Sequence, residues 1–369
     1  MNGLHGIIFA NEERAGLKEL VGPRCSASIP FGGRYRAVDF ALSNMVNAGI
    51  TDVGVVTHGQ YQSLLDHLGT GKAWDLSRKR GGLRFLPPFN YDHSRVLMPY
   101  RGNVEALAGI RSYLDTIRQD YVVLSDGDLV ANLPINEIFE QHLATKADIT
   151  VVMGADCFEI DDGTYFELED NRVKEVLVHL AHPRGYRGLD TFIISTELLK
   201  QVVDDCTSRN EYSWRRSVLQ ARKDQLNIQA YIWRGYAAQI RSVQEYYDRS
   251  MQLLDPAVRA DLFTPARPII GKAVDKSSAY VAPSGKIANS LMNDGCLIAG
   301  TVENSILFSG VVGEEGATVR GCILFRDAVV RKGAVVECVI GDKNVEIQEN
   351  HRLMGYATHP IVVEKNRRV

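Results

Sequence analysis

The chain has 369 residues, and its 42 Lys and Arg against 45 Asp and Glu give a formal net charge of −3 at pH 7. This balance gives no whole-chain attraction to nucleic acid or anionic lipid, so we expect neither as a partner. A hydrophobic content of 45% can fill the cores of two or three domains. No apolar run approaches the ~20 residues needed to cross a bilayer.

The six cysteines are widely spaced, at Cys25, Cys157, Cys206, Cys296, Cys322 and Cys338. They contain no C-x-x-C pair and therefore predict neither a disulfide framework nor a zinc site. The first residues, MNGLHGIIFANEE, lack the basic region and long apolar segment of a signal peptide. We therefore expect a protein of the reducing cytoplasm.

In residues 1–255, short apolar runs alternate with helical patterns, which is typical of a mostly parallel α/β sheet with helices on both faces. The predicted strands are Leu4–Ala10, Val53–Thr57, Val122–Ser125, Ile149–Met153, Thr191–Ser195 and Gln229–Trp233. Two segments, Asp39–Ala48 and Val104–Ile117, place apolar residues at i, i+3 and i+4 and predict helices. Prolines interrupt residues 256–284, which predicts a linker.

Residues 285–369 predict a second domain with a period of six. Small residues recur at Gly310, Gly316, Cys322, Ala328 and Ala334, followed by Val311, Ala317, Ile323, Val329 and Val335. This pattern predicts a parallel β-helix of hexapeptide repeats, in which the aliphatic stacks form the core. A glycine-rich β-sandwich is the alternative, but strands with period two do not explain the small positions.

The loop after the first predicted strand reads Asn11-Glu12-Glu13-Arg14-Ala15-Gly16-Leu17. A phosphate-binding loop needs glycines, so that backbone N–H groups can approach the oxygens, and no negative charge nearby. Because this loop holds one glycine and two glutamates, it is unsuited to a nucleoside triphosphate.

A second segment, residues 30–44, reads PFGGRYRAVDFALSN. It resembles the F-G-G-K-[YF]-R-I-I-D-F-A-L-S-N motif of the sugar-nucleotide pyrophosphorylases, and within them the ADP-glucose pyrophosphorylases of bacterial glycogen synthesis. Residues 100–106 (YRGNVEA) and 287–305 extend the resemblance over nearly the whole chain. The resemblance implies a nucleotide-diphospho-sugar transferase-like (Rossmann-like) domain followed by a left-handed β-helix.

Catalytic positions of that family are altered in this chain. Active members carry G-G-x-G-T-R-L, R-A-K-P-A, L-[AS]-G-D-H-I-Y and W-R-D-V-G-T, and a sugar-phosphate lysine in F-V-E-K-P that residues 176–183 do not match. The aligned residues here are Glu12 and Glu13 in the loop, Ser26 for a lysine, Gly127 and Gln239 for two metal carboxylates, and Arg241 for a glycine. Since two acidic ligands normally hold the catalytic Mg²⁺, we expect no retained catalytic residue and no metal or cofactor on this chain.

This pattern resembles the GlgD-type subunit of the family. The resemblance implies a non-catalytic or nearly inactive regulatory subunit that joins a catalytic GlgC-type paralogue, which carries the Mg²⁺, in a hetero-oligomer such as a heterotetramer. The alternative is a weakly active sugar-phosphate nucleotidylyltransferase that uses Asp128 and Mg²⁺, although we favour solvated loop acids for Asp126 and Asp128. An acyltransferase is disfavoured because residues 285–347 contain no histidine to act as a base.

Arg34 and Arg36 lie two residues apart in an extended segment and would present two cations to one side. The resemblance places them at the activator site between the two domains, as candidates for holding a sugar phosphate or another anion. The alternative is a structural pair bound to Asp39 or to backbone carbonyls.

Other basic residues carry less functional signal. Arg78, Lys79 and Arg80, with Arg84, form a basic loop that could face a phosphate, but we favour a solvated surface loop. His58 and His67 have no partners at metal-ligand spacing and are interpreted as surface or packing residues.

Overall fold

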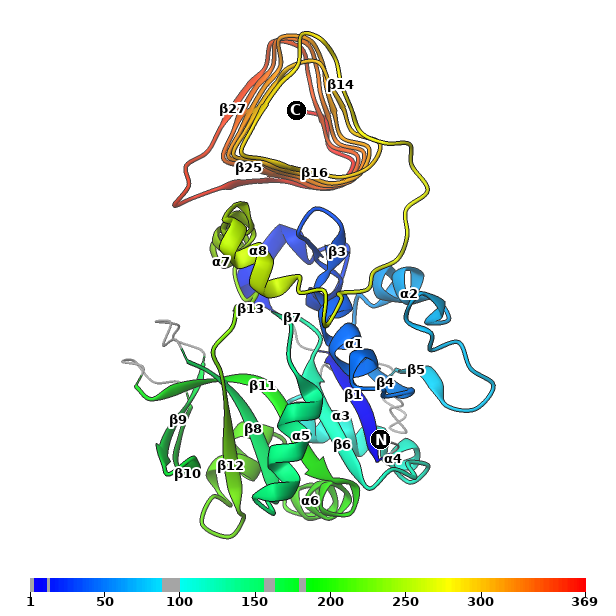
Figure 1. Ribbon diagram of the computed structural model, residues 1–369, viewed down its shortest axis with the longest axis vertical. Coiled ribbons are helices and arrows are strands. Elements are labelled where there is room, and N and C mark those ends of the chain that lie inside the picture. Colours follow the sequence, from blue (N-terminus) through cyan, green and yellow to red (C-terminus); the bar gives the residue numbers. More distant parts are fainter. Residues whose placement is uncertain (1–2, 12–13, 88–99, 156–162, 179–183) are drawn as a thin grey trace.

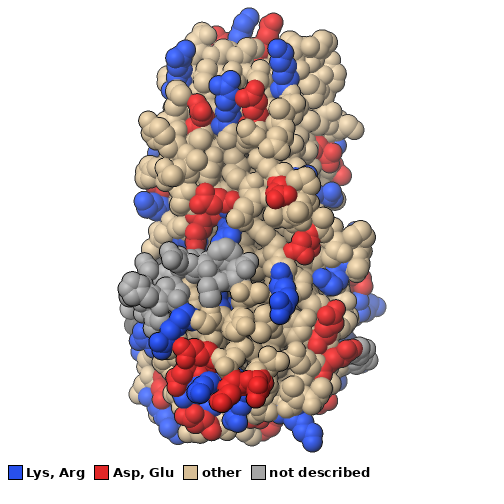
Figure 2. Space-filling model, turned by 60° about the vertical axis from the view of Figure 1, so that its left-hand side comes forward, with Lys and Arg blue, Asp and Glu red and all other residues tan. Residues whose placement is uncertain are grey.

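The computed structural model of the chain describes residues 3–11, 14–87, 100–155, 163–178 and 184–369. Glu12, Glu13 and Cys157 lie outside the described residues. Two domains stack along the long axis of the molecule, with the α/β domain at one end and a three-sided prism of short strands at the other (Figure 1). On the face drawn in Figure 2, basic and acidic side chains are interspersed, in line with the small net charge.

The α/β domain is built on a nine-stranded sheet in the order β5-β4-β1-β6-β11-β8-β12-β10-β9. The strands are β1 (Leu4–Ala10), β4 (Asp52–Thr57), β5 (Gly82–Leu86), β6 (Tyr121–Asp126), β8 (Ile149–Gly154), β9 (Thr164–Glu169), β10 (Arg172–Val178), β11 (Tyr186–Ser195) and β12 (Ile228–Trp233). Their pairings leave seven strands pointing one way and β10 and β11 the other. The predicted mostly parallel sheet and all six predicted strands are confirmed.

Strand β11 departs from the expected βαβ order, because it runs antiparallel to both of its neighbours, β6 and β8. It also begins at Tyr186, five residues before the predicted start at Thr191. A continuous apolar run indicates a strand buried on both faces, but burial does not depend on the direction of the chain. The direction of β11 was therefore beyond the reach of the sequence pattern.

Helices cover both faces of this sheet, as expected. The helices are α1 (Ala37–Asn47), α2 (Gln62–Leu68), α3 (Asn103–Gly109), α4 (Arg111–Leu114), α5 (Ile135–Ala144), α6 (Thr196–Ser208), α7 (Val243–Met251) and α8 (Pro256–Leu262). One apolar cluster joins the sheet to α3, α4 and α6, and another joins its opposite face to α1 and α5.

The single helix predicted over Val104–Ile117 is wrong, since the chain divides it at Ile110 into α3 and α4. Gly109 ends the first helix. A methyl group at Gly109 would lie 3.0 Å from the hydroxyl oxygen of Tyr100, so a better helix-forming residue would crowd that ring.

Two short strand pairs extend from the α/β domain towards the prism. They are β2 (Pro30–Phe31) with β3 (Tyr35–Arg36), and β7 (Leu129–Ala131) with β13 (Ala237–Gln239). The first pair carries the segment that contains Arg34 and Arg36.

The prism consists of three five-stranded parallel sheets, which confirms the predicted β-helix. The first sheet is β14 (Tyr280–Val281), β17 (Leu297–Ile298), β20 (Val312–Gly313), β23 (Val329–Val330) and β26 (Glu346–Ile347). The second is β15 (Lys286–Ala288), β18 (Thr301–Glu303), β21 (Thr318–Arg320), β24 (Val335–Glu337) and β27 (Arg352–Met354). The third is β16 (Leu291–Met292), β19 (Ile306–Leu307), β22 (Ile323–Leu324), β25 (Val339–Gly341) and β28 (Ile361–Val363). The first strand begins at Tyr280, before the expected boundary at residue 285.

The register of the coils differs from a strict six-residue repeat. Thr301 pairs with Thr318, and Thr318 pairs with Val335, so each of these coils spans 17 residues. Three hexapeptides would make 18, so one of the three sides of each coil is a residue short. The residues that fill the core therefore shift by one position relative to the predicted repeat. Ala328 and Ala334 lie in the core, at 1% and 0% exposure, whereas Val329 and Val335, which we expected to fill it, are partly exposed.

A shared apolar core joins the two domains and includes Phe31 and Phe40 of the α/β domain and Phe308 and Phe325 of the β-helix. Helix α8 lies in the expected linker, and its Leu262 packs in this same core. The helices of the described residues include none long and apolar enough to span a membrane.

One buried ion pair also crosses the interface. Nη2 of Arg24 donates to both carboxylate oxygens of Asp342, at 2.7 and 2.8 Å, and each residue is only 1% exposed. The α/β domain and the β-helix are therefore fixed to one another by charge as well as by apolar packing.

Candidate functional site

The carboxyl ends of β1 and β6 bring two aspartates to the place where an open parallel sheet binds its ligands. Asp126 is the last residue of β6, and Asp128 follows in the turn to β7. Both are buried, at 2% and 3% exposure, so our interpretation of them as solvated loop acids is wrong. Gly127 between them packs tightly, since a methyl group there would lie 2.9 Å from Cβ of Ala27.

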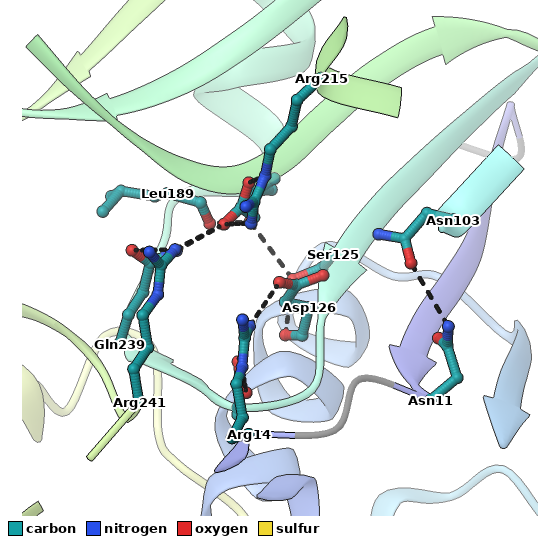
Figure 3. A network of polar contacts seen from close by, with 12 residues as sticks. Asn11, Arg14, Asn103, Ser125, Asp126, Leu189, Arg215, Gln239 and Arg241 are labelled. Atoms are coloured by element: carbon teal, nitrogen blue, oxygen red, sulfur yellow. Dashed lines mark hydrogen bonds and ion pairs between the residues drawn. The ribbon is translucent and has the colours of Figure 1, made fainter. Parts of the chain in front are cut away.

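Arg14, from the altered loop, lies against these two aspartates (Figure 3). Its Nε donates to Oδ2 of Asp128 at 2.9 Å, and its Nη2 approaches Oδ2 of Asp126 at 3.4 Å. Arg14 itself is 9% exposed. The chain therefore supplies its own cation to the carboxylates at the end of β6.

A second charged cluster lies beside the first (Figure 3). Asp190 belongs to β11, Gln239 ends β13 and Arg241 follows it, and Arg215 comes from the helical segment Trp214–Gln220. Asp190 accepts hydrogen bonds from Nη2 of Arg215 at 2.7 Å, Nε2 of Gln239 at 2.8 Å and Nη2 of Arg241 at 3.3 Å. Burial alone would raise the pKa of Asp190, but the guanidinium groups of Arg215 and Arg241 lower it overall. Gln239, at the family's second metal carboxylate, thus serves as a hydrogen-bond donor to a neighbouring acid.

Asp190 and Arg215 were not expected from the sequence. The signal available was a charged residue within an otherwise apolar strand, GLDTFII, where burial demands a partner. Asp190 also has a positive φ of 47°, a conformation that aspartate tolerates better than most residues. Its partner could not be found by spacing, because Arg215 lies 25 residues along the chain.

Arg187 is a further buried cation beside this cluster, at 4% exposure. Its Nε and Nη2 atoms have no hydrogen-bond partner among the described residues. Burial, and secondarily the nearby Arg241, lower the pKa of Arg187 to about 10. The three aspartates at the end of the sheet are thus paired with arginines of the same chain, and Arg187 lies beside them as a further buried cation.

The family's Mg²⁺ does not fit this arrangement. A hard divalent cation requires carboxylate oxygens that are open to it, but Arg14 covers Asp126 and Asp128 while Gln239 offers a neutral amide. Within the described ranges, no three His, Cys, Asp or Glu side chains are grouped so that they could hold a metal.

A cavity of about 530 Å³ adjoins the altered loop after β1, and its walls include Ser26 and His58. We call it the nucleotide-side cavity, because that loop aligns with the phosphate-binding motif of the family that the sequence resembles. Arg14 and Arg24 also line it, but both are paired with carboxylates. Burial raises the pKa of the Cys25 thiol in the same wall to about 11, so the thiol stays neutral. The cavity has room for a ligand, while the two arginines in its described lining are already occupied.

Arg34 and Arg36 meet at a second cavity of about 650 Å³, between the α/β domain and the β-helix. Arg34 is exposed, with its guanidinium 5.9 Å from the centre of the Tyr35 ring. Nη1 of Arg36 donates to the carbonyl oxygen and to Oγ of Ser63, at 2.6 and 3.0 Å. The structure thus brings the two arginines together, while giving Arg36 the backbone contact that we considered as an alternative.

Asp39, the other suggested partner of these arginines, is occupied differently. Its Oδ1 lies 2.6 Å from Nε2 of His67, and its Oδ2 accepts from the backbone N–H of Arg36 at 3.0 Å. A guanidinium pair with Asp39 is therefore wrong. His67 and His58 are both buried packing residues, and His58 contacts the Tyr100 ring.

The β-helix adds Arg326, Lys343 and Lys365 to the lining of the interdomain cavity, and no sequence motif indicated these cations. The other basic residues of the lining are Arg24, Arg34, Arg36 and Lys272, and its acidic residues are Asp66 and Asp275. Burial, with the nearby charges of Arg36 and Arg24, lowers the pKa of Lys343 to about 7. This cavity carries an excess of positive charge, whereas the centre at the end of β6 is largely neutralised internally.

Comparisons with known proteins agree with both domains. Residues 23–159 match the Nucleotidyl transferase family, and residues 272–358 match the GlmU-like C-terminal hexapeptide family. The chain is 32% identical over 364 residues to the glycogen biosynthesis protein GlgD of Bacillus subtilis (strain 168), covering 99% of this chain and 96% of that one. It is 34% identical over 321 residues to GlgD of Geobacillus stearothermophilus, with 86% and 83% covered.

A catalytic-type relative matches as well. The glucose-1-phosphate adenylyltransferase of Geobacillus stearothermophilus is 31% identical over 326 residues, with 85% of this chain and 82% of that protein covered. Both domains, their order and nearly the full length therefore agree, and the chain belongs to the glucose-1-phosphate adenylyltransferase (ADP-glucose pyrophosphorylase) family, in the branch of the glycogen biosynthesis protein GlgD.

Proposed function

We propose that this chain is a non-catalytic or nearly inactive regulatory subunit of glucose-1-phosphate adenylyltransferase, which modulates a catalytic paralogue during ADP-glucose synthesis for glycogen. The observation that carries the proposal is the pairing of Arg14 with Asp126 and Asp128, together with Gln239 at the second carboxylate position. Loss of one oriented charge contact in a phosphoryl-transfer site typically lowers the rate by about 10²–10³. Several such losses together leave little turnover.

A regulatory role also needs a site for an effector, and the interdomain cavity supports one. An anion such as a sugar phosphate would meet Arg34 from the β2–β3 segment and Lys343 from the β-helix. Because these residues come from different domains, a bound anion would favour one arrangement of the two domains over others. A partner subunit that contacts both domains would respond to that change. We propose a hetero-oligomer with the catalytic paralogue as that partner.

A weakly active transferase that uses Asp128 is the competing function. It requires Asp128 to bind Mg²⁺, and therefore requires Arg14 to leave a buried ion pair of 2.9 Å. Removing one member of such a pair leaves the other charge buried and uncompensated, which opposes this rearrangement.

The test is the release of pyrophosphate from ATP and glucose 1-phosphate with Mg²⁺, measured for this chain alone, for the catalytic paralogue alone, and for the mixture. We expect no turnover by this chain alone and a changed kcat or KM of the paralogue in the mixture. The variant Arg34→Gln should weaken that change, whereas Arg172→Gln, which removes an exposed charge far from the cavity, should not. Turnover by the chain alone at a rate like that of the paralogue would overturn the proposal.

A further inference from the structure

A third cavity, of about 620 Å³, lies at the opposite edge of the sheet from the nucleotide side. It is lined by residues at the amino ends of β1, β4 and β5 and by the segment that leads from α4 into β6. Because β5, β4, β1 and β6 are parallel, their amino ends meet at one edge. The cavity lies at the amino ends of these strands and is separate from the catalytic-type centre at their carboxyl ends.

Four cations line this cavity: Lys79, Arg80, Arg84 and Arg118. None of them forms an ion pair with a carboxylate in the part of the chain that the structure describes. The guanidinium of Arg84 lies 5.8 Å from the centre of the Tyr113 ring, which orients it without neutralising it. By contrast, Arg78 of the same basic loop turns away and pairs with Asp75.

The one acidic side chain of the described lining, Asp52, already has neutral donors on both oxygens. Its Oδ1 accepts from the backbone N–H of Gly82 at 3.0 Å, and its Oδ2 accepts from Nε2 of Gln119 at 2.7 Å. Gly81 makes this closure possible, since a methyl group there would lie 1.6 Å from Oδ1 of Asp52. The basic loop is therefore anchored to the edge of the sheet, and its cations are left available.

A buried polar atom at the cavity adds a second, independent signal. His5 is 4% exposed, and its Nε2 lies 2.9 Å from the hydroxyl oxygen of Tyr113. Its Nδ1 has no partner among the described residues. Since buried polar atoms are normally hydrogen-bonded, Nδ1 can take a polar partner from a ligand, beside the nearby Gln119 side chain.

We propose that this edge cavity is a second anion site, which binds a small molecule that carries a phosphate group. Its volume lies in the range of about 300–1,000 Å³ that is usual for small-molecule sites. Arginine forks recognise phosphate oxygens in pairs, and lysine adds a mobile point charge. The concentration of four cations contrasts with the net charge of −3 of the whole chain, so the attraction is local to the cavity.

The test is equilibrium dialysis of the full chain against labelled inorganic phosphate at constant ionic strength. In an Arg34→Gln/Lys343→Gln background, which weakens the interdomain cavity, we expect saturable binding to persist. Adding Arg84→Gln/Arg118→Gln should weaken that binding about tenfold, because two guanidinium groups that could donate to the phosphate oxygens are lost. A parallel arm with glucose 1-phosphate distinguishes free phosphate from a phosphorylated sugar as the better ligand.

The matched control is Arg172→Gln/Arg352→Gln, which removes the same charge from exposed positions outside the cavity. It should leave binding unchanged within about twofold, because Arg172 and Arg352 do not line the cavity. Since Arg84 and Arg118 are also exposed, the control matches them in exposure and differs in position. If the Arg84→Gln/Arg118→Gln chain does not fold, Lys79→Ala/Arg80→Ala on the exposed loop tests the same site.

The inference is overturned if the background variant shows no saturable binding, or if the edge-cavity and control substitutions weaken binding equally. Either result leaves the proposed regulatory role intact, because that role is measured by the kinetics of the catalytic paralogue.

Discussion

The centre at the end of β6 and the interdomain cavity differ in how their charges are balanced. In the first, Asp126, Asp128 and Asp190 are each met by an arginine of the same chain. In the second, cations from both domains outnumber the two aspartates. A site that is neutralised by its own side chains gains little from an ion, whereas a site with excess charge is stabilised by binding one. On our proposal, an anionic effector therefore binds at the second region and not at the first.

Arg24 belongs to both regions, because it lines both the nucleotide-side and the interdomain cavities. We therefore expect the largest effect from removing its partner, Asp342. We expect Asp342→Ala to lower the free energy of unfolding by about 3–5 kcal/mol, since it leaves the Arg24 charge buried without a partner. Urea unfolding measures this loss. The double variant Arg24→Met/Asp342→Leu should recover most of it, and a loss under about 1 kcal/mol for Asp342→Ala would contradict the assignment.

Arg14→Ala tests whether the first region is closed by its own cation. We expect the free energy of unfolding to fall by about 1.5–3 kcal/mol, because Asp126 and Asp128 lose their charged donor. We also expect Mn²⁺ to raise the Tm of the variant, since the uncovered carboxylates then resemble a cation site. The unaltered chain and the Arg14→Ala/Asp128→Asn variant should not respond to Mn²⁺. An equal response in all three proteins would refute this account.

Asp190 should make the first region sensitive to acid. Its folded pKa is lowered by Arg215 and Arg241, so its stabilisation is complete above the unfolded value of about 4 and is lost as the pH falls through the folded pKa. We expect Asp190→Asn to lower the unfolding free energy at neutral pH by roughly 1–2 kcal/mol and to flatten its decline in acid. Unfolding curves recorded across the acid range measure both effects, and an unchanged acid slope would count against them.

Lys343 should give the second region a dependence on pH near neutrality. With a pKa of about 7, its ammonium form, which attracts an anion, is lost as the pH rises. We expect the affinity for a sugar-phosphate effector to fall up to about tenfold between about pH 6 and about pH 8. Calorimetric titration at several pH values measures this fall. Lys343→Arg should bind with a weaker pH dependence, and an identical pH profile for the two proteins would assign the titration elsewhere.

A bound anion should also affect the stability of the folded chain through Lys343. Its folded pKa lies below the ordinary value, so the unfolded chain binds more protons between about 7 and about 10.4, and stability rises with pH over that interval. An anion that raises the pKa of Lys343 should reduce this slope.

The sequence predicted the main elements well because they depend on local periodicity. Six of the nine strands of the α/β sheet follow from short apolar runs, while β5, β9 and β10 were not predicted, and the β-helix follows from small residues at a spacing near six. The same patterns missed the direction of β11, the break at Ile110 and the 17-residue coils. Each of these depends on a neighbour in space: a flanking strand, the Tyr100 ring or the coil above.

The sequence by itself predicted that side chains at the family's catalytic positions are replaced, and it placed Arg34 and Arg36 two residues apart. It did not determine what the remaining side chains do. The pairing of Arg14 with Asp128, 114 residues apart, and the approach of Lys343 to Arg36 exist only because the sheet and the β-helix bring distant segments together. Electrostatic interactions depend on distance in space, whatever the separation along the chain. The folded structure alone therefore decided which cations are paired with a carboxylate and which are left to attract an anion.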